Sequence, residues 1–312
     1  MRLSTAIIYK QNQQSVSNSY SRYQESSVQL SNLQKVNSPS DDPVASAQAV
    51  ILAQTQASSA QYATSRSSAS NSLKLETTTL DQVTDVIQNI QTLIVEAGDT
   101  TYSDTDRQSL KTELQGYKDQ LLGLANSTDS NGNYIFAGYK TGSAPFSEDT
   151  TSDPSVISYV GSDTAISQKV DASRTMTVGD TGDDVFGDIF THINNVLDAL
   201  DISLDDTNGD NTNMDTYTAA LGTATTGMSD SLDDVLTIQA SVGSKINELD
   251  TLDSAGDSKD LIYSDLMTSL KGADATDWYD IISENTLRKA TLQAAYTAFS
   301  SMQSLSLFEM NS

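Results

Sequence analysis

The chain has 312 residues and a mean hydropathy of −0.36, and none of its apolar runs approaches the ~18 residues that a membrane-spanning helix needs. It carries 17 Lys and Arg against 42 Asp and Glu, a net charge of −25, which argues against nucleic acid and anionic membrane surfaces as partners. It contains no cysteine, which excludes disulfides, thiolate catalysis and cysteine-ligated metals. The N-terminus lacks a long apolar stretch followed by a small-residue cleavage site, so we expect no cleaved signal peptide.

The charge is distributed unevenly along the chain. Residues 1–42 hold four basic and three acidic side chains, and residues 290–312 hold Glu309 as their one charged group. Residues 175–244, in contrast, hold thirteen Asp and no Lys or Arg. Nearly neutral, amphipathic ends bury well against other chains, whereas an acidic middle stays solvated. The pattern therefore predicts that the chain associates through its ends.

The first predicted helix covers about residues 4–33. Its apolar residues recur at seven-residue intervals, with others at intermediate helical steps, which places them on one face. A helix with such a seam presents one stripe to a partner and winds around it with a left-handed twist. We expect an assembly interface along the stripe of Tyr9, Val16, Tyr20, Tyr23, Leu30 and Leu33.

A turn follows the first helix, in the segment Asn37-Ser38-Pro39-Ser40-Asp41-Asp42-Pro43. Pro39 disfavours helical geometry at the preceding residue, Ser38. Asp42 is placed to cap the next helix, with Pro43 at its first position, where a missing N–H costs nothing. The sequence predicts a fixed turn motif that comprises Asn37, Ser38, Asp41, Asp42 and Pro43.

Two more helices are predicted before the pattern changes. The second runs from Val44 to about Ala97, where Gly98 ends it, and its second half carries the seven-residue seam Leu73, Leu80, Ile87 and Ile94. The third covers about residues 104–126, where 3-4 spacing connects Arg107, Leu110, Leu114, Tyr117, Leu121 and Leu124.

The middle of the chain has a β-type pattern. Turn residues at 129–133 precede a predicted strand at 134–137, and residues 142–182 form a β-rich insertion with strand-like pieces at 156–160 and 176–178. A helical pattern resumes near Asp184 and covers residues 186–200, and a polar loop at 201–213 follows it.

The C-terminal part is again helical. A third seven-residue seam occupies residues 214–252 and consists of Met214, Leu221, Met228, Val235, Val242 and Leu249. Residues 254–260 are predicted to be a loop. A last helix begins near Trp278 and continues to about Phe308, and we expect its apolar residues to complete the assembly interface: Leu292, Tyr296, Phe299, Met302, Leu307 and Phe308.

These elements predict a mainly α protein, a long coiled-coil-like helical bundle rod made from both chain ends, with a small β-rich inserted domain. We divide it into an N-terminal assembly helix and turn (1–42), the N-terminal part of the rod (43–141), the outward-facing insertion (142–182), the C-terminal part of the rod (183–275) and a C-terminal assembly helix (276–312). The terminal helices can pair with each other or with neighbouring subunits, and the sequence leaves both arrangements open.

No catalytic, cofactor-binding or metal site is predicted. His192 is the only histidine, and without cysteine or a second histidine we expect it to be a surface or half-buried residue. Residues 205–211 hint at a calcium loop, but aligning Gly209 with the glycine of such a loop puts Leu204 at the first ligand position, so the motif fails. We interpret this segment as a solvated turn.

Three segments together resemble a known family. The turn at 37–45 resembles that of the bacterial flagellin superfamily, and its form with Pro43 is similar to the hook-associated proteins of the hook–filament junction. Residues 131–141 (Asn-Gly-Asn-Tyr-Ile-Phe-Ala-Gly-Tyr-Lys-Thr) and the C-terminal run from Leu292 to Phe308 are similar to that family again. The resemblance covers nearly the whole chain except the β-rich insertion.

The resemblance implies a structural component of the bacterial flagellum, secreted through the flagellar type III exporter, that forms the junction ring on which flagellin polymerises. It implies contacts with other copies in the ring, a neighbouring hook-associated junction protein on the hook side, flagellin on the distal side and a cytoplasmic export chaperone. A flagellin-type filament subunit or another secreted coiled-coil polymer is the alternative, and an enzyme is the third choice.

Overall fold

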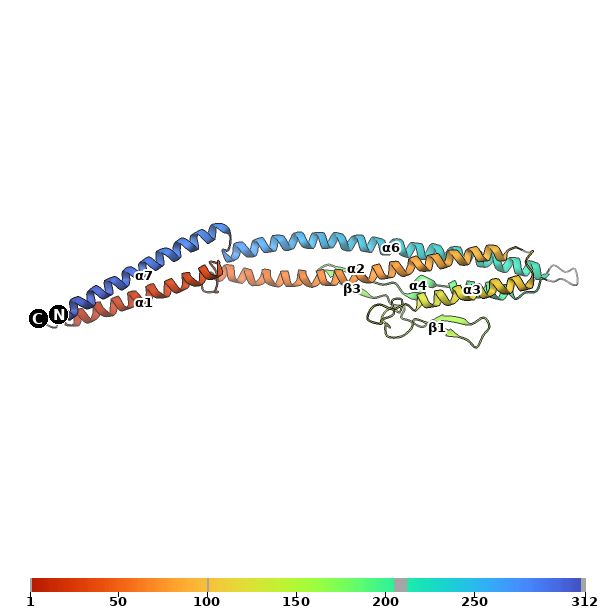
Figure 1. Cartoon of the computed structure of the whole chain (residues 1–312), viewed down its shortest axis with the longest axis horizontal. Coiled ribbons are helices and arrows are strands. Elements are labelled where there is room, and N and C mark those ends of the chain that lie inside the picture. The colour runs from red at the N-terminus through yellow and green to blue at the C-terminus, as the bar shows by residue number, and fades with distance from the viewer. Residues whose placement is uncertain (1, 100, 205–211, 310–312) are drawn as a thin grey trace. The chain divides into compact units, whose positions relative to one another are not determined.

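The computed structural model describes residues 2–99, 101–204 and 212–309, and within them the side chains of residues 7–303. The chain is mainly helical (Figure 1), and its elements follow in the order α1 (Arg2–Asn32), α2 (Pro43–Ala97), α3 (Asp104–Ala125), β1 (Phe146–Asp149), β2 (Val156–Tyr159), β3 (Ser167–Asp171), β4 (Arg174–Thr177), α4 (Gly182–Phe186), α5 (Ile189–Leu200), α6 (Thr212–Lys271) and α7 (Ala275–Glu309). Two compact units divide these elements: unit 1 comprises residues 1–60 and 256–312, and unit 2 comprises residues 61–255.

The hydrophobic core lies in unit 2. Residues of α2, α3, α5 and α6 form one cluster of buried side chains, which also receives residues of the β-rich insertion. The seam that the sequence predicts in α2 is buried throughout, with Leu73, Leu80 and Ile87 each 0 % exposed. The third seam is buried from Leu221 to Leu249 on α6. Both seven-residue patterns therefore mark core stripes of a helical bundle.

The start of α3 is held by polar groups. Ser103 and Asp106 form a capping box, in which each side chain accepts from the backbone N–H of the other residue. One turn later, Arg107 is buried, and its guanidinium pairs with Asp104. The same guanidinium donates to the Ile202 carbonyl at 3.2 Å and lies 5.7 Å from the ring centre of Tyr217. A position that the sequence pattern groups with Leu110 and Leu114 thus holds a buried ion pair within α3 and a cation–π contact to Tyr217 on α6.

The predicted β-rich insertion contains two antiparallel hairpins. β1 pairs with β2, with Phe146 opposite Tyr159, and β3 pairs with β4, with Ser167 opposite Thr177. The pieces expected at 156–160 and 176–178 are confirmed as β2 and β4, each shifted by one or two residues.

The strand predicted at 134–137 is wrong. Only an isolated bridge from Tyr134 to Thr128 forms there, and turns surround it at Gly132 and Gly138, which have φ values of 82° and 57°. The apolar run is explained by burial instead. Phe136 is 0 % exposed and meets the ring of Phe186 edge-on, with 5.4 Å between ring centres.

Two boundaries after the insertion also differ from expectation. The helix predicted at 186–200 is two helices, α4 and α5, because Gly187 takes a φ of 41° between them. The loop predicted at 254–260 is helical, within α6. Most residues of this run face solvent, where polar and small side chains leave a helix intact, and the buried Gly256 has no positive φ. The loop at 201–213 lies largely outside the described residues.

Unit 1 is built around the two terminal helices. α1 and α7 lie side by side and antiparallel (Figure 1), because residues near the start of one contact residues near the end of the other. Gly272, with a φ of 58°, turns the chain between α6 and α7. The backbone N–H groups of Lys35 and Val36 donate to the carbonyls of Gly272 and Lys271, each at 3.1 Å, which joins the two turns of unit 1.

Candidate assembly surface

The turn before α2 is held by two neighbouring carboxylates. Asp42 Oδ1 accepts from the backbone N–H groups of Val44 and Ala45, both at 3.0 Å, so it caps α2 as the sequence predicts. Asp41 Oδ2 closes the turn itself by accepting from the N–H groups of Asn37 at 3.0 Å and Ser38 at 2.8 Å. Pro43 is the first residue of the helix, as expected.

Replacing Asp42 by Ala is expected to destabilise unit 1 by ~1 kcal/mol, because two N–H groups at the start of α2 lose their acceptor. Pro43→Ala should cost less, since the first helical position tolerates both residues. We expect a motility defect from Asp42→Ala that exceeds the defect from Pro43→Ala in a strain that otherwise lacks the protein. Equal defects would mean that direct subunit contact, and not helix capping, explains the turn.

The end of α1 is tied to the start of α7 by Lys35 and Trp278. Lys35 pairs with Asp277 and, at 3.1 Å, with Asp280, and these hydrogen bonds raise the pKa of the Lys35 ammonium above its ordinary value. The indole Nε1 of Trp278 donates to the Leu33 carbonyl at 3.1 Å. Because the Lys35 side chain is still 41 % exposed, we assign these contacts a positioning role and little net stability.

Farther along, α1 and α7 meet through a mixed seam. The ring centres of Tyr9 and Phe299 lie 5.4 Å apart. Two polar contacts accompany them: Asn12 Nδ2 donates to the sulfur of Met302 at 2.9 Å, and Asn285 Nδ2 donates to Ser26 Oγ at 3.1 Å. The seam is only partly covered. Its apolar members from the predicted stripes are half-buried, apart from the buried Leu292: Val16, Tyr23, Leu30, Phe299 and Met302.

The remaining predicted interface residues are exposed or lie beyond the described side chains. Tyr20 is 48 % exposed and Tyr296 is 51 % exposed, and Tyr9 and Leu33 are also exposed. Leu307 and Phe308 belong to α7, but their side chains lie outside those that the structure describes. The structure thus brings part of the predicted set together within one chain and leaves another part facing solvent.

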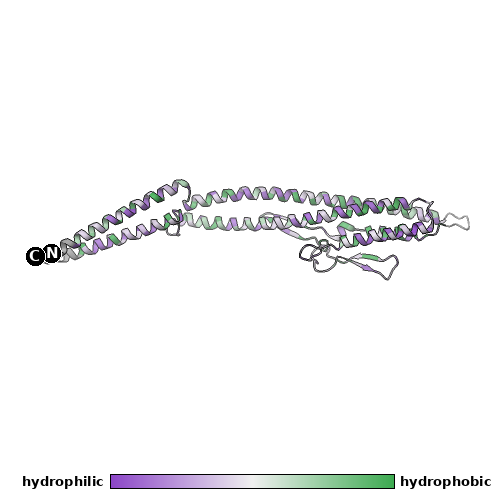
Figure 2. Ribbon diagram, in the orientation of Figure 1, coloured by the Kyte–Doolittle hydropathy of each residue, from purple (hydrophilic) through white to green (hydrophobic). Residues whose placement is uncertain are grey.

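Sequence reasoning missed a larger group of exposed apolar residues. Among the described residues, most large apolar side chains that face solvent belong to unit 1, including Ile7, Ile8, Val28, Val44, Val50, Ile51, Leu261, Ile262, Leu266, Tyr279, Ile282 and Leu287. Figure 2 shows hydrophobic residues alternating with hydrophilic ones along both α1 and α7. These apolar residues lie outside the seven-residue seams. A helix that pairs along its seam cannot bury them within the chain, and this mismatch could have identified them from the sequence.

Charged side chains are also distributed unequally between the two units. Residues 1–60 and 256–312 hold eight basic and eleven acidic side chains, whereas residues 61–255 hold nine basic and thirty-one acidic ones. Unit 1 is therefore nearly neutral, and unit 2 carries most of the net charge of −25. Unit 1 is the part that can approach another copy with little repulsion.

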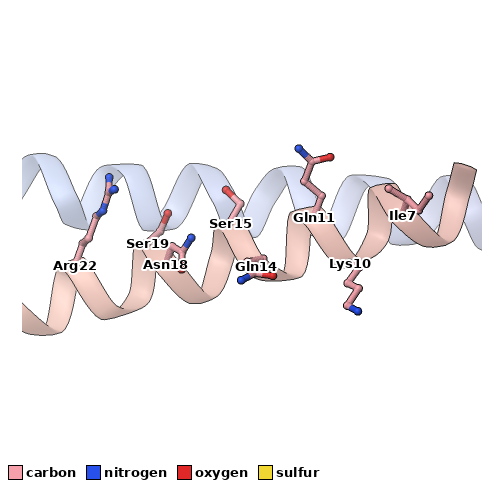
Figure 3. A pocket seen from close by; sticks show the side chains of 8 residues that line it. All are labelled: Ile7, Lys10, Gln11, Gln14, Ser15, Asn18, Ser19 and Arg22. Atoms are coloured by element: carbon pink, nitrogen blue, oxygen red, sulfur yellow. The ribbon is translucent and has the colours of Figure 1, made fainter.

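A shallow groove along α1 offers no enclosed ligand site. Eight residues of this one helix line it (Figure 3): Ile7, Lys10, Gln11, Gln14, Ser15, Asn18, Ser19 and Arg22. Gln11, Ser15 and Arg22 point to one side of the helix and Lys10 to the other. Its mainly polar lining on a single helix is typical of a solvated or contact surface, and not of a pocket that encloses a small molecule.

No metal centre is found in the described part of the chain, where no three His, Asp or Glu side chains gather closely enough to hold an ion. His192 is half-buried, as the sequence predicts, and its ring packs against Gly227 on α6. Within the same described ranges, no helix combines the length and the hydropathy that crossing a membrane requires.

Comparison with known proteins defines the class first. Residues 3–141 match the model of the bacterial flagellin N-terminal helical region, which covers α1, the turn, α2 and α3. The flagellar hook-associated protein 3 of Escherichia coli (strain K12) is 42 % identical over 328 aligned positions, which cover 100 % of both chains. The chain belongs to the flagellar hook-associated protein 3 family. It is accordingly a structural component of the bacterial flagellum and not an enzyme.

Two solved structures share the fold. The flagellar hook-associated protein-3 from Legionella pneumophila superposes with a TM-score of 0.66 at 17 % identity, over 72 % of this chain and 99 % of that one. A structure described as the flagellar junction protein FlgL from the same organism gives a TM-score of 0.60 at 18 % identity, over 72 % of this chain and 100 % of that one.

Proposed function

We propose that this chain forms a ring at the hook–filament junction, on which flagellin polymerises. The observation that carries the proposal is the exposed apolar surface of unit 1, on a part of the chain that is nearly neutral. An isolated pair of helices cannot cover apolar residues on its outer faces, and neighbouring copies can. Membership in the hook-associated protein 3 family supports the location of the ring.

We propose residues 1–42 and 276–312 as the assembly elements of the ring. Residues 43–141 and 183–275 are then the two parts of the helical framework, and residues 142–182 face outward from it. The partners of the ring are further copies of the chain, a hook-associated junction protein on the hook side and flagellin on the distal side. A further partner is a cytoplasmic chaperone, which prevents the apolar surface from associating before export.

Replacing Tyr20 or Tyr296 by Ser tests the assembly surface. Each ring is about half exposed, so we expect the stability of the monomer to change by less than about 0.5 kcal/mol. Assembly onto isolated hooks and motility should nevertheless fall, because the ring loses apolar area at the contact between copies. Tyr139→Ser is the matched control, since this tyrosine is 60 % exposed in unit 2 and its loss should leave motility unchanged.

Unchanged motility for both variants would exclude these tyrosines from the contact between copies. Immunogold labelling of hook–filament complexes tests the location independently. Label confined to one band at the base of the filament supports the junction ring, whereas label along the whole filament supports a flagellin-type subunit instead.

A further inference from the structure

A carboxyl group is buried in the middle of unit 2. Glu76 on α2 is 0 % exposed. Its Oε1 accepts from the backbone N–H of Asp180 at 3.0 Å, and its Oε2 is buried with no hydrogen-bond partner among the residues that the structure describes. A charged carboxylate in such a place is costly unless it is fully paired, so its presence in a helical core requires an explanation.

Two charged groups from other elements face Glu76. Asp180 lies between β4 and α4, and Lys245 lies on α6; the Lys245 ammonium contacts the two carboxylate oxygens of Asp180 at 3.1 and 3.2 Å. The cluster thus joins α2, α6 and the segment that leaves the β3–β4 hairpin. With both carboxyls ionised it carries one uncompensated negative charge, and a single proton makes it neutral.

The electrostatics favour that proton. Burial, followed by the nearby charge of Asp180, raises the pKa of Glu76 from 4.5 to about 7. Protonated Glu76 can also donate from its otherwise unpartnered oxygen. The other ionic contacts that hold the hairpin lack a group of this kind: Arg66 pairs with Asp253 and donates to the Val170 carbonyl at 3.2 Å, and Arg174 pairs with Glu248 at 2.7 Å on the surface.

We propose that Glu76, Asp180 and Lys245 form a proton-controlled latch, which holds the β3–β4 hairpin and the segment after it on the α2–α6 pair. The latch is closed when Glu76 carries a proton and loosens when that proton leaves. Because the flagellum lies outside the cell, the pH of the medium sets how firmly the segment at 167–182 is attached to the helices.

The direction of the pH dependence follows from the raised pKa. In the open state Glu76 is solvated and titrates near 4.5, whereas in the closed state it titrates near 7. The stabilisation of the closed latch is therefore full below pH 4.5, falls progressively between pH 4.5 and 7, and does not fall further above pH 7. Between pH 5 and pH 8 the equilibrium constant for opening should rise on the order of 50-fold.

Hydrogen exchange of the full-length monomer measures this opening. Protection of the backbone N–H groups at 167–182, corrected for the intrinsic effect of pH on exchange, should fall on the order of 50-fold from pH 5 to pH 8. Glu76→Gln keeps the shape of the side chain and removes its charge, so protection in that variant should be high and independent of pH. Peptides from residues 84–94 of α2 serve as the internal reference.

Glu248→Gln is the matched control variant. It breaks the exposed ionic contact between the same hairpin and α6, and it should lower protection equally at every pH. A carbon-13 titration of the Glu76 carboxyl, assigned by its absence in Glu76→Gln, gives a second readout with an expected midpoint near 7. A midpoint below 5.5, or the same pH dependence in wild type and Glu76→Gln, would overturn the latch.

Discussion

A double truncate spanning residues 36–279 is expected to stay folded and monomeric but to support no filament growth. All residues of the buried core cluster lie between Ala69 and Leu249, so the truncation removes none of them. It does remove α1 and most of α7, and with them the exposed apolar residues of those helices that we assign to assembly. Circular dichroism should show a helical protein with a cooperative thermal transition, and a strain that makes only this truncate should be non-motile.

The control for this experiment is the full-length chain carried through the same expression and purification. Recovery of motility with the truncate would show that the terminal helices are dispensable and would contradict the proposed role of unit 1. Loss of the cooperative transition would instead mean that the core in unit 2 depends on the terminal helices for its stability.

Two leucines at equivalent places in their seams are expected to differ widely in their effect on stability. Leu80→Ala should destabilise unit 2 by roughly 3 kcal/mol, because Leu80 is 0 % exposed and its loss leaves a cavity among packed helices. Leu30→Ala should destabilise unit 1 by no more than about 1 kcal/mol, because Leu30 is half-buried in a pair of helices that solvent already reaches.

The two effects can be measured separately in one protein. Trp278 is the only tryptophan and belongs to unit 1, so its fluorescence follows the unfolding of that unit. Circular dichroism at 222 nm follows the helices of both units. Leu80→Ala should move the main circular dichroism transition in urea, whereas Leu30→Ala should move the fluorescence transition and leave the main circular dichroism transition in place. Equal shifts in the urea midpoints of the two variants would mean that Leu30 and Leu80 are buried to the same extent.

The helices and the turn could be predicted because their signals are local. A seven-residue apolar repeat, a capping aspartate and a proline at the first helical position act within one or two turns of chain. The structure confirms α1, the turn at Asp42, α2 and α3 within one or two residues of the predicted bounds. The β-type pieces of the insertion were recognised for the same reason, from short β-branched and aromatic runs between turns.

The errors arose where packing overrides a local pattern. The run Tyr134-Ile135-Phe136-Ala137 has the composition of a strand, but it has no strand to pair with, and Phe136 is a core residue instead. The polar run at 254–260 has the composition of a loop, but it is helical because neither a proline nor a glycine with positive φ interrupts α6. Composition describes what a residue tolerates, and its neighbours in space decide which state it takes.

The candidate assembly surface was only half predictable. Residues at seven-residue spacing were identified, yet the pattern is the same for a stripe that packs within the chain and for one that packs on another copy. The buried Leu80 and the half-buried Leu30 illustrate this, since both occupy seam positions. The off-seam residues Tyr279 and Leu287 carried no periodic signal and were recognised only by their exposure.

By itself, the sequence determined the long helices, the turn that separates them, the neutral ends and acidic middle, and the resemblance to flagellar proteins, because all of these depend on residue identity and spacing. Only the tertiary structure decided which seams form a core, which apolar residues stay exposed, and that Glu76, Asp180 and Lys245 meet. Burial and charge proximity depend on which distant segments fold together, and residue spacing along one chain does not contain that information.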